Sequence, residues 1–119
     1  MEISGGGDME VSPEVYKSYM IERALRRSYV KRRIVMYLFL NGFGYISEIA
    51  RNISVTPTNV IGAIRGMDNR YTAEGSLLNL GVVSEAEINK DDNVKMFCLT
   101  SILGQDAVRT CKKLDKGVA

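Results

Sequence analysis

Apolar and polar residues alternate through the first part of the chain with the three-to-four-residue period of an amphipathic helix. The pattern begins after Ser12 and Pro13, a pair typical of a helix start because serine accepts a backbone N–H and proline has none to satisfy. It ends at Gly42, a residue type that commonly terminates helices. This segment is expected to form either one long helix or two helices broken near Arg27 and Ser28.

Two shorter helical patterns follow, separated by a tight turn. The first covers residues 46–53, where the apolar positions have the spacing of a short amphipathic helix. Ser54 and Val55 are expected to form the turn. Thr56 then caps a further helix, predicted over residues 57–67, with a proline at its first position and an apolar stripe along one face.

The second half of the chain predicts a short helix, a hairpin and a final helix. The short helix is expected over residues 73–80, with Thr72 as its cap. Two strands are expected at residues 82–88 and 94–99, joined by the turn-forming sequence NKDDN at residues 89–93. The last helix is predicted over residues 101–114, capped by Thr100 or Ser101. The predicted fold class is mainly α with a small β-hairpin, an α+β arrangement.

The composition is typical of one globular domain. Of the 119 residues, 45% are apolar and 25% are charged, a balance unlike that of disordered chains. Residues 1–11 are expected to be a flexible tail and residues 12–119 a single domain. The longest apolar run, residues 34–40, is much shorter than the roughly 20 residues that span a bilayer. The acidic, glycine-rich start does not resemble a secretory signal, so we expect a cytoplasmic protein without a membrane segment.

Catalytic and metal-binding chemistry has little support in the sequence. The chain has no histidine, the commonest metal ligand and general base. Its two cysteines, Cys98 and Cys111, lack the spacing of a metal or redox pair and are expected to be buried thiols. No carboxylate pair, phosphate-binding glycine loop or serine-based constellation stands out. We therefore expect neither an enzyme nor a bound metal or cofactor.

Positive charge is concentrated in one part of the chain. Residues 15–70 carry ten basic and three acidic residues, whereas residues 1–14 carry four acidic residues and no basic one. The rest of the chain carries six basic and seven acidic residues. A basic block of this kind is typical of nucleic-acid binders, although solvated helices often have the same composition.

Three segments carry the most informative motifs. They are YISEIARNISVTPTNVIGAIR at residues 45–65, LLNLGVVSE at residues 77–85 and CLTSILGQDAV at residues 98–108. Together they resemble winged helix-turn-helix transcriptional regulators over residues 29–114, most closely the archaeal branch of that family. The resemblance implies a sequence-specific regulator of double-stranded DNA, with residues 57–67 as the recognition helix in the major groove. An insertion at residues 66–76 departs from the family pattern, and Asp91 and Asp92 in the wing weaken the case for a phosphate contact there.

The resemblance also implies which side chains contact DNA. The candidates on the predicted recognition helix lie off its apolar stripe or at its cap, and they are Thr56, Thr58, Asn59, Gly62 and Arg65. Arginine can pair with guanine, asparagine with adenine, and threonine with a phosphate or a thymine methyl, while glycine allows close approach of the backbone. The candidates for phosphate contacts are Arg51, Arg70, Arg32 and Arg33. For each residue the alternative is an ordinary solvent-exposed polar face.

The first helix carries more apolar surface than a small helical core needs. The residues concerned are Val15, Tyr16, Tyr19, Met20 and Leu25. Either this helix folds back on its own domain, or it pairs with a second copy, because helix-turn-helix proteins commonly dimerise. We expect a homodimer, with the final helix as a second contributor. The alternative function is a winged-helix protein–protein interaction module that does not read DNA, and the sequence identifies no effector ligand.

Overall fold

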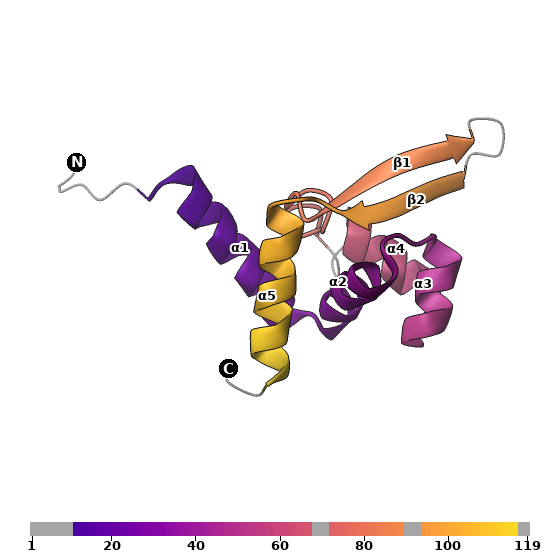
Figure 1. The fold of residues 1–119 in the computed structure, drawn as a ribbon, viewed down its shortest axis with the longest axis horizontal. Coiled ribbons are helices and arrows are strands. Elements are labelled where there is room, and N and C mark those ends of the chain that lie inside the picture. Colours follow the sequence, from indigo (N-terminus) through magenta and orange to yellow (C-terminus); the bar gives the residue numbers. More distant parts are fainter. Residues whose placement is uncertain (1–10, 68–71, 90–93, 117–119) are drawn as a thin grey trace.

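Five helices and a two-stranded antiparallel sheet make up the part of the chain that the computed structural model describes, residues 11–67, 72–89 and 94–116. They follow in the order α1 (Pro13–Arg27), α2 (Tyr29–Asn41), α3 (Ile46–Ile53), α4 (Pro57–Arg65), β1 (Val83–Asn89), β2 (Val94–Leu99) and α5 (Leu103–Asp115). In Figure 1 the hairpin extends to one side of the central helices and α1 extends to the other. The arrangement confirms the predicted fold class, mainly α with a small β-hairpin.

Two serines start the first two helices and settle whether this segment forms one helix or two. Ser12 accepts a hydrogen bond from the first turn of α1, and Ser28 accepts one from the amide of Lys31 over 3.1 Å. Ser28 has an extended backbone (φ −131°, ψ 105°), so the helix cannot continue through it. The guanidinium of Arg32 donates to two carbonyl groups at the end of α1. The chain therefore forms two helices, broken at the predicted place.

One apolar core joins the helices to the base of the hairpin. Helix α2 lies at its centre, where Ile34, Val35 and Leu38 are almost fully buried, and it contacts α1, α3, α4, α5 and β2. Helix α5 lies across α1 and α2 (Figure 1). Ile21 and Leu25 of α1 are also buried. The C-terminal half of α1 therefore folds back on its own domain, and Leu25 is unavailable for pairing with a second copy.

The segment between α4 and β1 forms turns where a helix over residues 73–80 was expected, so that expectation is wrong. The amides of Leu77 and Leu78 donate to the carbonyls of Ala63 and Ile64 in α4, over 3.1 and 3.0 Å. These bonds to another helix replace bonds that a local helix would need. The segment therefore covers the free carbonyl groups at the end of α4.

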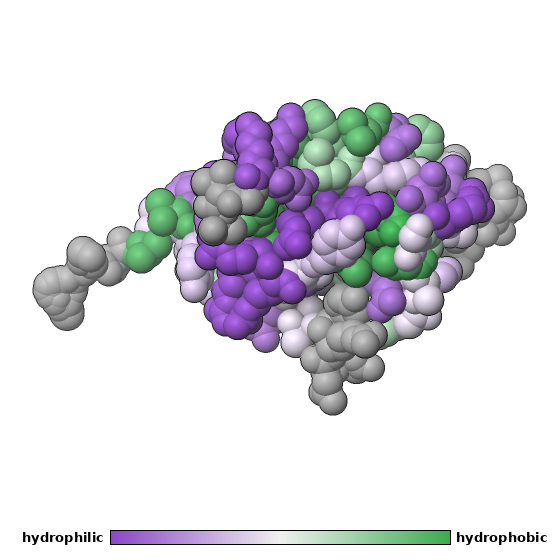
Figure 2. All heavy atoms as spheres, turned by 90° about the horizontal axis from the view of Figure 1, so that it is seen from below, coloured by the Kyte–Doolittle hydropathy of each residue, from purple (hydrophilic) through white to green (hydrophobic). Residues whose placement is uncertain are grey.

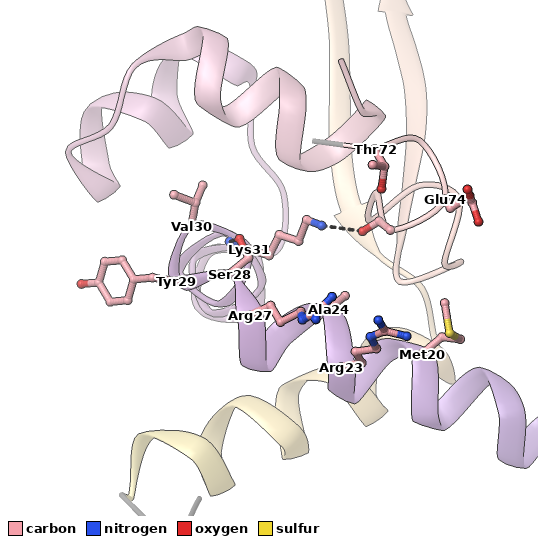
Figure 3. Close-up of a pocket in the computed structure, with 11 residues that line it drawn as sticks. Met20, Arg23, Ala24, Arg27, Ser28, Tyr29, Val30, Lys31, Thr72 and Glu74 are labelled. Atoms are coloured by element: carbon pink, nitrogen blue, oxygen red, sulfur yellow. Dashed lines mark hydrogen bonds between the residues drawn. The ribbon is translucent and has the colours of Figure 1, made fainter. Parts of the chain in front are cut away.

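Lys31 ties the same segment to α2. Its side chain is 8% exposed, and its Nζ donates to the carbonyl oxygen of Gly75 over 2.6 Å (Figure 3). Burial lowers the pKa of Lys31 below its usual value, because the charged ammonium loses contact with water. The contact joins the start of α2 to a part of the chain 44 residues away.

The hairpin is anchored to the body of the protein by its second strand. Glu85 of β1 faces Phe97 of β2 in the antiparallel register. Phe97 also exchanges two backbone hydrogen bonds with Gly44, of 3.0 and 2.9 Å, and so ties β2 to the connection between α2 and α3. The predicted wing tip with Asp91 and Asp92 lies outside the described residues.

Large apolar side chains remain exposed at the start of α1. Val15, Tyr16 and Tyr19 are each more than half exposed, whereas Met20, directly after Tyr19, is partly buried against the core. Figure 2 shows apolar residues at the end of the molecule where the described chain begins, and a mostly hydrophilic surface beside them. The apolar stripe predicted from the sequence is therefore divided between the core and the surface.

Candidate nucleic-acid interface

A helix-turn-helix unit is formed by α3, α4 and the short turn between them. Ser54 has a left-handed backbone (φ 62°, ψ 45°), which reverses the chain after α3. The Val55 amide donates to the Ala50 carbonyl over 3.0 Å and closes the turn. Ile53 and Val60 are buried, and the two helices are in contact. The predicted turn at Ser54 and Val55 is confirmed.

The start of α4 is open to solvent. Thr56 caps the helix, because its Oγ1 accepts a hydrogen bond from the Asn59 amide over 3.2 Å. Thr56 and Thr58 are exposed, and Asn59 is half-buried. At its other end α4 stops at Arg65 rather than at residue 67, because Gly66 takes a positive φ of 84° and leaves the helical region. The predicted recognition helix is thus two residues too long.

Gly62 does not lie on the exposed face of α4, contrary to the prediction. It is buried, as are its neighbours Ala63 and Ile64. Glycine has only backbone atoms, so a buried glycine means that neighbouring side chains cover the helix backbone at this position. The expectation that DNA approaches the backbone closely at Gly62 is therefore wrong.

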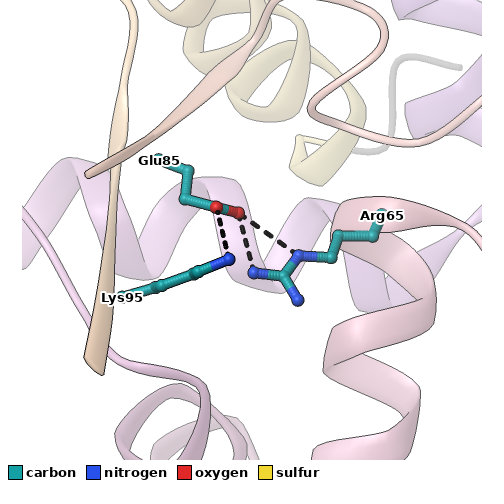
Figure 4. A network of polar contacts seen from close by, with 3 residues as sticks. All are labelled: Arg65, Glu85 and Lys95. Atoms are coloured by element: carbon teal, nitrogen blue, oxygen red, sulfur yellow. Dashed lines mark hydrogen bonds and ion pairs between the residues drawn. The ribbon is translucent and has the colours of Figure 1, made fainter. Parts of the chain in front are cut away.

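Arg65, the predicted guanine contact, is held by the wing. Its Nε and Nη2 donate to Oε1 of Glu85 over 3.2 and 2.8 Å, and Nζ of Lys95 lies 3.2 Å from Oε2 of the same carboxylate (Figure 4). The guanidinium also lies over the Phe97 ring, 5.5 Å from its centroid. The side chain of Arg65 keeps 37% of its surface exposed. Glu85 occupies two of its five N–H donors, so an acceptor that approached the Nε edge would have to displace the carboxylate.

Glu85 and Lys95 are functional candidates that are absent from the residues predicted from the sequence. Partial burial raises the pKa of Glu85, but the hydrogen bonds and charges of Arg65 and Lys95 outweigh this effect and hold the pKa below its usual value. The pairing of the two strands indicates their proximity, since Glu85 faces Phe97 and Lys95 lies two residues before Phe97. Side chains two residues apart on a strand share a face, so the correct register would have placed both charges together.

The remaining basic candidates have different surroundings. Arg51 is exposed on α3 and has no hydrogen bond or ion pair to another described residue. Arg32 is half-buried and caps the end of α1, and Arg33 is half-buried with a hydrogen bond to the hydroxyl of Tyr29. Arg70 lies outside the described residues. Of these arginines, Arg51 is the one whose guanidinium is open and next to the turn.

The site contains hydrogen-bond donors and acceptors rather than a metal-binding set. Within residues 11–67, 72–89 and 94–116, no group of three or more side chains could hold a metal ion. In the same ranges no helix has the length and apolar character needed to cross a membrane.

Cys111 is buried as expected, whereas Cys98 is only half-buried. The prediction that Cys98 is a buried thiol is wrong. Cys98 and the buried Phe97 are neighbours on β2, so their side chains lie on opposite faces of the strand.

Comparison with known proteins places this geometry in a family. Residues 21–109, from α1 into α5, match the EarA-like family. The chain belongs to the EarA-like family. An uncharacterized protein of the archaeon Methanocaldococcus jannaschii is 35% identical to this EarA-like chain over 99 residues, which cover 81% of the chain and 85% of the relative.

A solved structure has a fold similar to that of the EarA-like chain. YusO from Bacillus subtilis matches with a TM-score of 0.52 at 17% identity, over 87% of this chain and 70% of YusO. At this identity the likeness concerns the fold alone. With the helix-turn-helix unit and the hairpin, it gives the EarA-like chain a winged helix-turn-helix fold with an extra N-terminal helix.

Proposed function

We propose that this EarA-like protein is a transcriptional regulator that binds double-stranded DNA in the cytoplasm and catalyses no reaction. The observation that carries the proposal is the exposed start of α4, directly after the turn of a helix-turn-helix unit. In proteins with this unit, the second helix enters the major groove and its N-terminal residues contact base edges. The similarity of its fold to that of YusO is consistent with the same proposal.

The side chains at the start of α4 suit base and phosphate contacts. The amide of Asn59 can pair with adenine, and Thr58 can reach a phosphate or a thymine methyl. At the start of α4, Pro57 has no N–H and the Asn59 amide bonds Thr56, which leaves the Thr58 amide for a phosphate. Arg51, on the preceding helix, can neutralise a backbone phosphate and release a counterion, which makes binding sensitive to salt.

Arg65 has a second role in this proposal. In the free protein it joins α4 to β1 through Glu85. A guanine edge or a phosphate offers a guanidinium the same pair of acceptor positions that a carboxylate offers. DNA would therefore compete with Glu85 for Arg65, and the wing would lose one contact with the recognition helix when DNA binds.

The proposed form of the protein is a homodimer. Val15, Tyr16 and Tyr19 form an exposed apolar face on the projecting half of α1. A second copy that covers this face would remove three large side chains from water. Two recognition helices could then read half-sites about 34 Å apart on one face of the DNA.

Selection of bound sequences from random double-stranded DNA tests the proposed function. We expect one enriched motif, with an affinity in fluorescence anisotropy that falls steeply as salt is added. Thr58→Ala should weaken binding to that motif more than to random DNA, and Arg51→Ala should weaken both about equally. Arg109→Ala on α5 is the matched control for Arg51→Ala and should have little effect. A folded protein that enriches no motif and does not bind heparin would contradict the proposal.

A protein–protein interaction module is the second candidate function. It is favoured by Leu40 and Phe43 near the end of α2, which are 75% and 46% exposed. Such a module would enrich no sequence in the same selection. Leu40→Asp separates the two functions, because it should leave DNA affinity unchanged under our proposal and should abolish partner binding if the module is the correct function.

A further inference from the structure

A cavity of about 580 Å³ opens between α1, the start of α2 and residues 72–75, on a part of the protein that the proposed DNA contacts do not use. Its walls include three basic residues, Arg23, Arg27 and Lys31, and one acidic residue, Glu74. Figure 3 shows Arg23 and Arg27 on the side of α1 that faces residues 72–75. The volume lies within the range of small-molecule sites, about 300 to 1,000 Å³.

The two arginines of this cavity have no hydrogen bond or ion pair with any described residue. Three other described arginines have carboxylate partners, in the pairs Arg26–Glu22, Arg65–Glu85 and Arg109–Asp106. Arg26 lies between Arg23 and Arg27 on the same helix and does not line the cavity. Arg23 and Arg27 thus line the cavity without an internal partner among the described residues, and an anion in the cavity could bind both.

The start of α2 adds to the positive character of the wall. Tyr29 and Val30, the first two residues of the helix, line the cavity. Their amides have no acceptor among the described residues, and a helix start favours negative charge. Among the described residues, the ammonium of buried Lys31 donates one hydrogen bond, to the Gly75 carbonyl, which leaves two of its three N–H donors.

We propose that this cavity binds a small organic phosphate. Three basic side chains and one carboxylate give the wall a charge of +2, which complements the charge of about −2 on a phosphate monoester. Met20, Ala24 and Val30 provide an apolar surface for the organic part of the ligand. The phosphate lies among the two guanidinium groups, the Lys31 ammonium and the start of α2.

The cavity is connected to the recognition helix by the segment that forms one of its walls. Lys31 holds Gly75, and the amides of Leu77 and Leu78 bond the carbonyls of Ala63 and Ile64 in α4. An occupant beside Gly75 therefore acts on the segment that covers the end of α4. This consequence rests on the proposed function, and it makes the ligand a regulator of DNA affinity.

Isothermal titration calorimetry of the full chain with phenyl phosphate tests the site in the absence of DNA. We expect phenyl phosphate to bind more tightly than inorganic phosphate and phenol to bind more weakly than either. The double variant Arg23→Gln, Arg27→Gln should lose at least about tenfold in affinity, because two charge-assisted hydrogen bonds are removed. Both residues are exposed, so the fold should persist, which circular dichroism checks. Arg26→Gln removes one positive charge from the same helix outside the cavity and should bind phenyl phosphate as the parent does.

Three results would overturn the site: no binding by the parent, equal binding by the double variant, or an equal loss in Arg26→Gln. If the double variant binds phenyl phosphate equally but has lost DNA affinity, the second result also assigns the two arginines to the DNA backbone. Anisotropy with the selected DNA, with and without saturating phenyl phosphate, then tests regulation separately. Regulation is supported if phenyl phosphate changes the DNA affinity of the parent but not that of the double variant. If phenyl phosphate changes the DNA affinity of neither protein, the ligand has no regulatory role.

Discussion

The contact between Arg65 and Glu85 joins α4 to the hairpin through two partly exposed side chains. Their exposed fractions are 37% and 26%, so water and salt screen the ion pair. Pairs of this kind contribute no more than about 1 kcal/mol to the free energy of unfolding. The contact is therefore weak enough for a DNA phosphate or base to replace Glu85 without disturbing the fold.

Glu85→Gln should raise DNA affinity and steepen its salt dependence, because it frees Arg65 and Lys95 and removes one negative charge. Each additional phosphate contact steepens the slope of log affinity against log salt by about 0.9. Anisotropy titrations at several salt concentrations measure both quantities. In an Arg65→Ala background the gain should be smaller, since only Lys95 is released. An equal gain in both backgrounds would remove Arg65 from the DNA contact.

The two cysteines should differ sharply in reactivity. Burial raises the pKa of Cys111 to about 12, with Asp115 raising it further and Arg32 lowering it. Because the folded pKa lies above the usual 9.0, the protonated thiol stabilises the fold below that pH, and this stability is lost as the pH rises toward about 12. At mildly alkaline pH, iodoacetamide should modify half-buried Cys98 in the folded protein and Cys111 only after unfolding, as peptide mass spectrometry would show. Equal rates for both thiols would contradict the burial of Cys111.

At the scale of elements, the sequence predicts helix starts well where a single side chain makes the cap. Ser12, Ser28 and Thr56 each bond an amide three residues further on, so the signal is local. Residues 73–80 fail as a helix for the opposite reason, because Leu77 and Leu78 bond carbonyls of α4. Such a contact depends on the packing of two segments, and local patterns do not contain it.

Thr56 is both the cap of α4 and a candidate DNA contact, and two substitutions separate these roles. Thr56→Ala removes the acceptor of the Asn59 amide and should lower the free energy of unfolding by about 1 kcal/mol. Thr56→Asp keeps a capping oxygen and should preserve stability, but its charge should weaken DNA binding by repelling phosphate. Urea unfolding and anisotropy measure the two effects. If Thr56→Asp leaves DNA affinity unchanged, the start of α4 does not face the phosphate backbone.

At the scale of the whole molecule, the order of elements follows from the sequence except for the helix expected at residues 73–80, whereas the surfaces that the elements leave open do not. The helical period identifies the apolar face of α1, but it does not say what covers that face. In the fold, Ile21 and Leu25 pack into the core while Tyr16 and Tyr19 remain exposed. The basic block likewise does not translate into one DNA surface, because Arg32 is used to cap α1.

The exposed half of α1 should hold two copies of the protein together. Tyr16 and Tyr19 are more than half exposed and lie one turn apart, and burying such rings in a dimer gains free energy in proportion to the area removed from water. The double variant Tyr16→Asp, Tyr19→Asp should therefore be a folded monomer in sedimentation velocity at tens of micromolar, where the parent sediments as a dimer. Leu40→Asp places one such charge on a more exposed apolar position at the end of α2 and should remain a dimer. A monomeric parent, or a double variant that still sediments as a dimer, would exclude α1 as the interface.

The monomeric variant should also bind DNA differently from the parent. Its affinity for a single half-site should equal that of the parent. It should lose the added affinity that the parent has for DNA with two half-sites, because only the dimer can engage both sites at once.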